Sequence, residues 1–309
     1  MRSTHPARRP TVEILIVSHN TAELLADCLT SISCNLPSPN FASVSVAVFD
    51  NGSTDGSVEV IRSQFPSVRL LSNEENIGFA RANNRLAKSS RADYLLLLNS
   101  DTRFKEDAIT PLLVVLQNNP SIGVVGPRLI YPSGDPQYSS ERFPNLHFEI
   151  VRALQGTRVD VITRGRIGRM LRRYRRVDEI DRRVSHRSEF LWATCWLLPA
   201  EEVHQHGLFD EHFVTYDEDL DFCWRLRQRG RYVMYLATSE VIHLGGASST
   251  SDIKRRLMFA ARQKFYRRTA GLAAVGVYRA SVGAIDRLKY ARRGFGRRRA
   301  ESPSTRQRG

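Results

Sequence analysis

The first hundred residues alternate short apolar runs with stretches in which apolar positions recur at helical spacing. Short apolar runs bounded by turn residues predict strands, and apolar positions three or four residues apart predict helices. The pattern predicts strands at Val12–Ser18, Val44–Asp50, Val68–Ser72 and Tyr94–Leu98, and helices at Thr21–Ile32, Ser57–Phe65 and Gly78–Ser89. Repeated strand–loop–helix units of this length predict an α/β fold, with a mostly parallel central sheet flanked by helices.

The second half of the chain is less regular than the first. Residues 145–188 are rich in Arg and show no clear period, so we expect an excursion or lid within the core domain. An apolar run returns at Phe190–Leu198, residues 199–230 have helical character, and Tyr232–His243 is predicted to be a strand. We therefore expect a single α/β domain over residues 11–250.

The two ends of the chain are basic. We expect a basic amphipathic helical extension over residues 251–292, with apolar residues at helical spacing, namely Leu257, Ala261, Phe265 and Leu272. Residues 293–309 have the composition of a disordered basic tail, and residues 1–10 that of a basic disordered N-terminus.

The positive charge of the chain is concentrated in this extension. The net charge is +14, and from Lys254 onward seventeen Lys and Arg residues face only two acids, Asp286 and Glu301. A second Arg cluster occupies residues 164–176. Such patches suit an anionic membrane surface, a lipid diphosphate or a nucleic acid.

Other features of the composition narrow the class of protein. No run of about 18 apolar residues occurs, the length that a membrane-spanning helix needs. The N-terminus has no apolar segment typical of a secretory signal, so we do not expect secretion. The four Cys residues lack metal-type spacing, and we expect free thiols in a reducing compartment.

Polar clusters follow the predicted strands, at Ser18-His19-Asn20, Asp50-Asn51 and Asn99-Ser100-Asp101. Ligands of open α/β sheets bind at the carboxyl ends of the strands, so these clusters are expected to converge. Asp50 can accept the N3–H of uracil or thymine, and it equally suits an Asx turn or helix cap. Asp101 follows four leucines, and a divalent cation that bridges two phosphates would suit a carboxylate delivered by a buried strand.

An acidic run at residues 217–221 is the strongest candidate for proton transfer. It contains Asp217, Glu218, Asp219 and Asp221, which are also consistent with a solvated helix start favoured by the helix dipole. Large apolar residues surround the run, including Phe213, Tyr216, Phe222 and Trp224. Crowding and desolvation there would raise at least one carboxyl pKa toward the value that a general base needs.

Five segments together, ILIVSHN, VFDNGSTDGS, NIGFARANN, YLLLLNSDT and FDEHFVTYDEDLDFCWRLRQRG…VIHLGG, resemble family-2 glycosyltransferases of the GT-A fold. The similarity covers residues 11–250, and the rhamnosyltransferase-like branch is the most similar. It implies an inverting, metal-dependent transfer of a sugar from a nucleotide diphosphate donor to a hydroxyl group. It also implies that the metal ion is Mg²⁺ or Mn²⁺.

The resemblance assigns roles to individual residues. Asp219 becomes the catalytic base, Glu218 and Trp192 contact the acceptor, and Asp101 and His243 hold the metal ion. The residues assigned to the nucleotide sugar are Ser18, Asn20, Asp50, Asn51, Ser53, Asn76, Gly78, Arg81, Asn84, Asn99 and Ser100. From the residues alone, His243 is more often a hydrogen-bonded structural residue than a metal ligand, Asn76 suits a helix cap, and Arg81 is equally a solvated charge.

Two departures from the family pattern limit which properties of the family can be expected of this chain. Asn99 stands where the family often has an aspartate, which weakens the charge of the metal site. Trp192 precedes Ala193 where the branch usually has a Gly-Ala pair. The identity of the acceptor is therefore not inferred from the family.

The resemblance leaves three hypotheses open. The first is transfer of rhamnose from dTDP-rhamnose to a cell-envelope glycan or polyprenyl-linked acceptor, by a cytoplasmic enzyme peripheral to the inner face of the membrane. The second is a UDP-sugar donor, galactofuranose or a hexose, because uracil and thymine share the N3–H. The third is a basic nucleic-acid-binding module, which is not favoured because the chain has no stacking motif or recognition helix.

Overall fold

The computed structural model describes residues 8–38, 42–146, 165–166, 169, 183–213, 215–245 and 251–300. The chain divides into two compact units. The first comprises residues 1–143 and 181–261 and contains the sheet, and the second comprises residues 144–180 and 262–309. The predicted N-terminal segment 1–10 and the excursion 145–188 therefore lie largely outside the described residues, as do residues 301–309.

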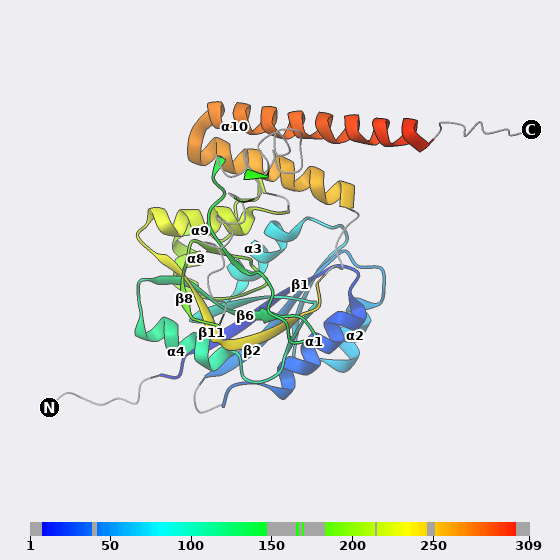
Figure 1. The fold of residues 1–309 in the computed structure, drawn as a ribbon. Coiled ribbons are helices and arrows are strands. Elements are labelled where there is room, and N and C mark those ends of the chain that lie inside the picture. Colours follow the sequence, from blue (N-terminus) through cyan, green and yellow to red (C-terminus); the bar gives the residue numbers. More distant parts are fainter. Residues whose placement is uncertain are drawn as a thin grey trace, which may run out of the picture. The chain divides into compact units, whose positions relative to one another are not determined.

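A nine-stranded sheet forms the centre of the first unit, in the order β3-β2-β1-β4-β10-β6-β11-β5, with β8 paired to β11 (Figure 1). Its strands are β1 (Thr11–Ser18), β2 (Ser43–Asn51), β3 (Arg69–Asn73), β4 (Tyr94–Asn99), β5 (Thr102–Phe104), β6 (Ile122–Ile130), β8 (His186–Ser188), β10 (Cys195–Pro199) and β11 (Tyr232–His243). Strands β3, β2, β1 and β4 are mutually parallel, and β6 is parallel to β11. Strand β10 is antiparallel to both β4 and β6.

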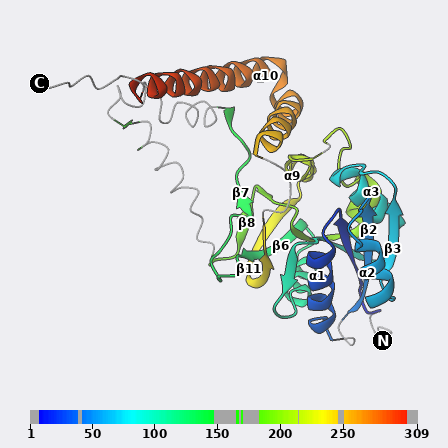
Figure 2. The ribbon, with the colours of Figure 1, turned by 90° about the vertical axis from the view of Figure 1, so that its right-hand side faces the viewer.

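The helices of this unit are α1 (Ala22–Cys34), α2 (Ser57–Gln64), α3 (Phe79–Ser89), α4 (Ile109–Asn118), α8 (Ala200–His206) and α9 (Glu218–Gln228). Figure 2 shows α1 and α2 side by side, next to the half of the sheet formed by β1, β2 and β3. The sheet and its helices confirm the predicted α/β fold.

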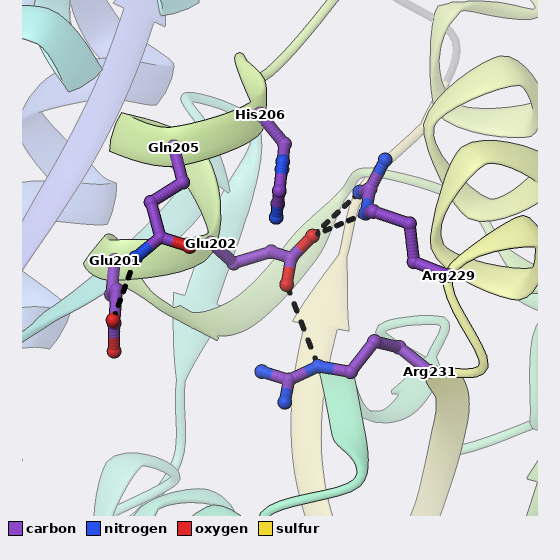
Figure 3. A pocket seen from close by; sticks show the side chains of 6 residues that line it. All are labelled: Glu201, Glu202, Gln205, His206, Arg229 and Arg231. Atoms are coloured by element: carbon purple, nitrogen blue, oxygen red, sulfur yellow. Dashed lines mark hydrogen bonds and ion pairs between the residues drawn. The ribbon is translucent and has the colours of Figure 1, made fainter.

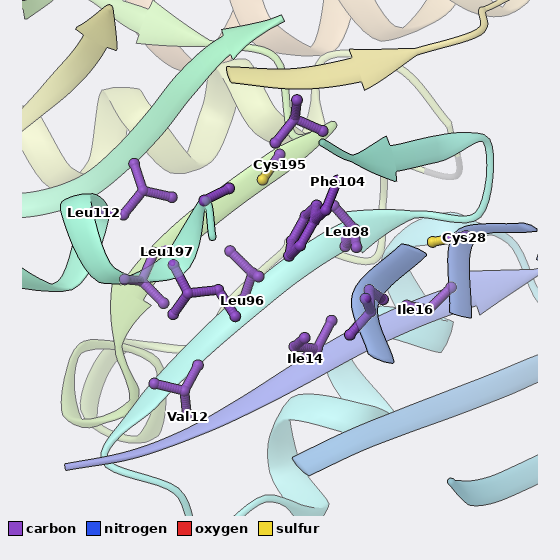
Figure 4. Packing of buried hydrophobic residues seen from close by; sticks show 14 of the residues in the cluster. Val12, Ile14, Ile16, Cys28, Leu96, Leu98, Phe104, Leu112, Cys195 and Leu197 are labelled. Carbon is purple, nitrogen blue, oxygen red and sulfur yellow. The ribbon is translucent and has the colours of Figure 1, made fainter. Parts of the chain in front are cut away.

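Alternate residues of the central strands face opposite layers, as the period of two in a strand requires. On one face, Val12, Ile14 and Ile16 of β1 join Leu96 and Leu98 of β4 in a fully buried cluster with side chains of α1, α2 and α4 (Figure 4). Burial of one such side chain contributes about 1.5–3 kcal/mol relative to leaving it in water. This layer anchors the strands whose carboxyl ends carry the polar clusters.

The other face of the sheet is covered by aromatic residues. The ring of Trp196 on β10 lies 6.1 Å from that of Phe209 and 5.8 Å from that of Phe222 on α9. The Phe209 ring is also 5.9 Å from that of Phe79, the first residue of α3. These contacts join α3 and α9 against the sheet, so the acidic run is attached to a rigid aromatic layer.

Several elements differ from the sequence prediction. Helix α4 and strands β5 and β6 were not anticipated. The apolar run Phe190–Leu198 contains two strands: β9 (Phe190–Leu191) pairs with β7 (Ser140–Glu141) in a separate two-stranded sheet, and a turn then leads into β10. The helical region 199–230 is two helices, because Gly207, with φ 72°, ends α8.

Helix α10 (Ser251–Ala300) departs from the predicted single amphipathic helix. Gly271 has φ 81°, a left-handed value that interrupts the helix, and the rings of Tyr266 and Tyr278 lie 5.2 Å apart across this break. The predicted apolar stripe was wrong, because Ala261 and Phe265 are buried while Leu257 and Leu272 are 37% and 71% exposed. The helix also continues past residue 292, where we expected disorder to begin.

Two negative findings apply to the described part of the chain. All four Cys residues are free thiols there, as the sequence predicted, with Cys34 exposed and the others buried. Among the helices that the structure describes, none combines the length and apolar character required to cross a membrane.

Candidate active site

The predicted polar clusters meet at one edge of the sheet. Strand register places Ser18 opposite Asp50 and Val17 opposite Asn99, so the carboxyl ends of β1, β2 and β4 are level. Strand β11 ends at His243, which pairs with Thr102 just beyond β4. The convergence expected from strand order is therefore present in the fold.

Asp50 is almost fully buried at this edge. Its Oδ2 accepts a hydrogen bond of 3.1 Å from the Ser53 amide, so one carboxylate oxygen serves the local turn. Its Oδ1 is buried and has no hydrogen-bond partner in the part of the chain described. A buried carboxylate oxygen without a partner costs about 1–3 kcal/mol, so this atom is open to a hydrogen-bond donor.

The loops after β1 and β2 lock together beside Asp50. The Asn20 amide donates to Ser53 Oγ at 2.9 Å, and the Thr54 amide donates to Asn20 Oδ1 at 2.8 Å. Asn20 has φ 53°, a left-handed value that is uncommon for residues other than glycine. The interlocking hydrogen bonds keep Asn20 and Ser53, two of the predicted nucleoside residues, in contact with each other.

Hydroxyl groups connect β1 with the residue after β4. Ser18 Oγ lies 2.8 Å from Thr21 Oγ1, which donates to Ser100 Oγ at 3.1 Å. The Asn99 amide donates to the carbonyl of Thr194 at 2.9 Å, which fixes the end of β4 against the start of β10. Ser18, Asn99 and Ser100 thus lie together, and their contact with a nucleotide sugar remains a prediction.

The loop before α3 is held to the end of β2. Asn51 Oδ1 accepts from the Ile77 amide at 2.8 Å, and Asn51 Nδ2 donates to Asn76 Oδ1 at 3.0 Å. Asn76 Oδ1 also accepts from the Gly78 amide at 2.9 Å. Gly52 permits this approach, since a Cβ there would lie 2.8 Å from the carbonyl carbon of Glu75. Asn51, Asn76 and Gly78 are therefore held together by hydrogen bonds at the end of β2.

Arg81 and Asn84 on α3 face the segment that leads to the acidic run. Asn84 Nδ2 donates to the Phe209 carbonyl at 2.8 Å, and the Phe209 amide donates to Asn84 Oδ1 at 2.9 Å. Arg81 Nε lies 3.4 Å from Glu211 Oε2. Asn84 thus holds the backbone of Phe209, a structural role that we did not predict. The contact of Arg81 and Asn84 with the nucleotide sugar remains a prediction.

The two predicted metal ligands are neighbours. His243 Nε2 lies 3.3 Å from Asp101 Oδ2, and both side chains are mostly buried. The Leu244 amide donates to the Asp101 carbonyl at 2.9 Å, which ties the end of β11 to the residue after β4. A carboxylate oxygen and an imidazole nitrogen suit Mn²⁺ or Mg²⁺, so the donor set fits the predicted ion.

Two protein ligands leave most of a six-coordinate shell open. Within the described residues there is no group of three or more His, Cys, Asp or Glu side chains that could hold an ion. Phosphate oxygens of a bound nucleotide would therefore have to complete the shell, which is common for Mg²⁺.

Gln137 is a site residue that the sequence prediction missed. It lies in the loop after β6 and hydrogen-bonds His243 twice, through Nε2 to the carbonyl at 2.6 Å and through Oε1 to Nδ1 at 2.7 Å. No motif in the sequence pointed to this glutamine, because its partner is 106 positions away.

The acidic run begins with strained backbone. Tyr216 and Asp217 have φ of 71° and 61°, left-handed values that cost free energy in residues other than glycine, and α9 begins at Glu218. Such strain is concentrated at functional sites. Asp221 is fully buried and pairs with Arg225 at 2.9 Å, so this carboxylate supports the fold.

Asp219 has the environment of a general base. Its Oδ1 accepts from the Leu220 amide at 2.8 Å and its Oδ2 from the Ala193 amide at 3.3 Å. Burial raises the pKa of Asp219 to about 7, and the negative charge of Asp217 adds to this effect. Because Ala193 follows Trp192, which is 41% exposed, the predicted acceptor residue lies beside the predicted base.

Glu218 differs from Asp219 in its hydrogen bonding. Its side chain is buried, and Oε2 has no hydrogen-bond partner in the described part of the chain. Burial raises the pKa of Glu218 well above its ordinary value, and the charges of Asp219 and Asp217 add to the rise. A protonated Glu218 can donate a hydrogen bond while Asp219 accepts a proton.

Figure 3 shows a second polar cluster, in which Glu202 lies between Arg229 and Arg231. Glu202 on α8 pairs with Arg229 after α9 at 2.5 Å and with Arg231 before β11 at 3.4 Å, beside a cavity of about 210 Å³. Arg231 precedes the amino end of β11, whereas His243 ends that strand, so this cluster belongs to the opposite edge. Since both guanidinium groups are paired with Glu202, we assign it a structural role.

The sequence is similar to those of known glycosyltransferases. The model of the glycosyl transferase family 2 matches residues 13–177. The N-acetylglucosaminyl-diphospho-decaprenol L-rhamnosyltransferase of Mycobacterium tuberculosis is 28% identical over 253 residues, which cover 77% of this chain and 78% of that protein. The O-antigen biosynthesis protein RfbC of Myxococcus xanthus is 25% identical over 254 residues, which cover 81% of this chain and 19% of that protein.

Solved structures with the same fold include GalNAc-T7 with UDP, GalNAc and Mn²⁺, at a TM-score of 0.57 and 15% identity, covering 90% of this chain and 55% of that one. The mannosyltransferase PcManGT from Pyrobaculum calidifontis, with GDP-Man and Mn²⁺, has a TM-score of 0.56 and 15% identity, covering 96% of this chain and 82% of that one. The family model matches more than half of the chain, and the fold agrees with it. The chain therefore belongs to glycosyl transferase family 2, as a glycosyltransferase of the GT-A fold that is rhamnosyltransferase-like in sequence.

Proposed function

We propose that this glycosyltransferase inverts the configuration of the transferred sugar, with Asp219 as the general base. The observation that carries the proposal is a carboxylate whose pKa is raised to about 7 by burial, beside the exposed ring of Trp192. A base with a pKa near the working pH is both sufficiently ionised and sufficiently basic to accept a proton.

The proposed reaction is a single in-line displacement. Asp219 takes the proton from an acceptor hydroxyl, and that oxygen forms a bond to the anomeric carbon of the donor sugar. The bond from the anomeric carbon to the phosphate oxygen breaks, and its electron pair leaves with the nucleotide diphosphate. Glu218, the buried neighbour of Asp219, orients the acceptor through its carboxyl group. No covalent sugar–enzyme intermediate forms, so the configuration at the anomeric carbon inverts.

The free Oδ1 of Asp50 supports a nucleoside with an N3–H group, which thymine and uracil share. We propose dTDP-rhamnose as the donor, because the relative with 28% identity is named a rhamnosyltransferase. A UDP-sugar with galactofuranose or a hexose is the alternative. Binding of dTDP-rhamnose and of UDP-sugars, measured by thermal shift, separates the two.

Asp101 and His243 are the residues proposed to hold Mg²⁺ or Mn²⁺. Both solved structures of the same fold contain Mn²⁺. When bound, the ion offsets the negative charge that grows on the leaving diphosphate. The two side chains already lie next to each other, so the protein does not need to rearrange them to bind the ion.

The experiment that tests the proposed function is transfer or hydrolysis of a panel of nucleotide sugars, with and without Mn²⁺. We expect turnover of dTDP-rhamnose that requires the divalent cation and yields the inverted anomer, detected by NMR of the product. A product of retained configuration would contradict the mechanism, and turnover unaffected by EDTA would contradict the metal site.

We propose a cell-envelope glycan or a polyprenyl-linked sugar as acceptor, and an anionic membrane on the cytoplasmic side as the surface where it is met. The relative from Mycobacterium tuberculosis acts, by its name, on a decaprenol-linked sugar. Residues 254–283 contain eight Lys and Arg and no acid, and Leu272 is 71% exposed directly after the break at Gly271. Basic and exposed apolar residues together favour a membrane interface.

Flotation of the full-length protein with liposomes tests this surface. We expect binding to vesicles that contain phosphatidylglycerol, little binding to phosphatidylcholine alone, and weaker binding of Leu272→Glu. Leu36→Glu is the matched control, because Leu36 is 43% exposed on the first unit, outside the basic extension. Binding to nonspecific DNA but not to anionic vesicles would instead favour the nucleic-acid hypothesis.

A further inference from the structure

The side chain of Gln137 is buried and makes both of its hydrogen bonds to one residue, His243. Its Nε2 donates to the backbone carbonyl of His243 at 2.6 Å, and its Oε1 lies 2.7 Å from Nδ1 of the imidazole. The glutamine therefore contacts the imidazole on the side opposite to Asp101, which faces Nε2.

These two contacts determine where the imidazole proton lies. A carbonyl oxygen only accepts hydrogen bonds, so the amide nitrogen of Gln137 must face the His243 carbonyl. The amide oxygen is then left to face Nδ1, and because this oxygen also only accepts, Nδ1 must carry the proton. A neutral imidazole has a single N–H group, so Nε2 of His243 is left with a bare lone pair.

That lone pair faces a carboxylate. His243 Nε2 lies 3.3 Å from Asp101 Oδ2, which is also an acceptor. Two acceptors at this distance repel each other unless a cation or a proton lies between them. The arrangement therefore favours the binding of a positive ion at Asp101 and His243.

The backbone holds all three residues in this arrangement. The Gln137 amide donates to the Leu129 carbonyl at 2.8 Å, which attaches the glutamine to β6. His243 is fixed by pairing of β11 with Thr102, and the Asp101 carbonyl accepts from the Leu244 amide. The cation site thus forms where three separate parts of the sheet meet.

We propose that Gln137 is a positioning residue, which keeps His243 in the Nδ1–H tautomer so that Nε2 and Asp101 together bind the divalent cation. The proposal rests on the metal site of the proposed function and adds the residue that prepares it. Loss of a group that orients a metal-binding imidazole commonly weakens metal affinity by about 10–100-fold.

The test measures Mn²⁺ binding to the full-length protein by isothermal titration, with saturating dTDP and no sugar. Gln137→Leu removes both hydrogen bonds at similar size, and we expect Mn²⁺ to bind about 10–100-fold more weakly. Gln137→Glu keeps an acceptor at Nδ1 but loses the donor to the His243 carbonyl, so we expect a smaller loss of Mn²⁺ affinity than in Gln137→Leu. Gln205→Leu is the control, since Gln205 lies on α8 in the cluster at the opposite edge of the sheet.

A second measurement does not depend on the metal. Two-bond ¹⁵N–¹H correlation spectra of the metal-free protein at pH 8 report the tautomer of His243, and we expect Nδ1–H in the wild type and in Gln137→Glu. Gln137→Leu should show a mixture of tautomers.

Three results would overturn the proposal: an Nε2–H tautomer in the wild type, absence of Mn²⁺ binding, or equal loss of affinity in Gln137→Leu and Gln137→Glu. The last result would show that Gln137 only fills space. A wild type that binds Mn²⁺ with the expected tautomer but transfers no sugar would contradict the proposed function and leave this inference intact.

Discussion

Replacement of Asp219 by Asn gives the sharpest test of the site, because it removes the proton acceptor and keeps the shape of the side chain. The amide oxygen of Asn can still accept from the amides of Leu220 or Ala193, the two hydrogen bonds that hold Asp219 in place. We expect transfer to fall by at least about 100-fold, the usual contribution of a general base. Binding of dTDP should be unchanged, because Asp219 is not among the predicted nucleotide residues.

The raised pKa also fixes the pH dependence. With a pKa of about 7, roughly 9% of Asp219 is ionised at pH 6 and roughly 91% at pH 8, so kcat/KM should rise about tenfold over this interval. The rise should be absent from whatever residual activity Asp219→Asn retains. A wild-type profile that is flat from pH 6 to pH 8 would contradict the assignment.

The same shift has a cost in stability that can be worked out. The pKa of Asp219 rises from 3.8 to about 7 on folding, so the native state binds the proton more tightly than the unfolded chain. This contribution to the free energy of unfolding is complete below pH 4 and is lost as the pH rises through 7. Three pKa units correspond to about 4 kcal/mol. Asp219 is only half-buried, so screening by solvent reduces the expected loss to about 2 kcal/mol.

Urea denaturation at pH 4 and pH 8 measures this loss. Between the lower and the higher pH, the free energy of unfolding of Asp219→Asn should rise by about 2 kcal/mol relative to that of the wild type, because Asn does not titrate. Asp27→Asn is the control: Asp27 forms an exposed ion pair with Arg103 on the surface of α1, and such pairs contribute little. Equal pH dependence of stability in Asp219→Asn and the wild type would refute the argument.

Three further changes test the supports of the site. Asp50→Ala should weaken dTDP and UDP by about 10-fold or more but leave N3-methyl-UDP unaffected, as measured by titration calorimetry. Asn84→Ala should lower the free energy of unfolding by about 1–3 kcal/mol, because the amide and carbonyl of Phe209 lose their partners. Arg225→Met should cost about 3–5 kcal/mol by leaving Asp221 buried without its ion pair, and the added change Asp221→Asn should recover part of this; failure to recover any would contradict the buried-charge explanation.

The sequence by itself determined the sheet edge and the acids that lie on it. Apolar runs predict where a strand ends, and in parallel strands those ends lie at one edge. The apolar runs that precede Asp50 and Asp101 therefore predicted that both lie at this edge, and the register of β1, β2 and β4 agrees. A raised carboxyl pKa in the acidic run was likewise expected from the large apolar residues near it in the sequence, and the pKa of Asp219 is raised.

Only the tertiary structure decided how these residues are supported. The partners of Asp219, His243 and Asn84 lie 26, 106 and 125 positions away, in Ala193, Gln137 and Phe209. Local periodicity carries no information about such pairs, because each depends on how distant strands and helices are brought together. The same reason explains why the break in the C-terminal helix was not predicted: helical spacing assumes a continuous helix, and the left-handed backbone of Gly271 ends that continuity.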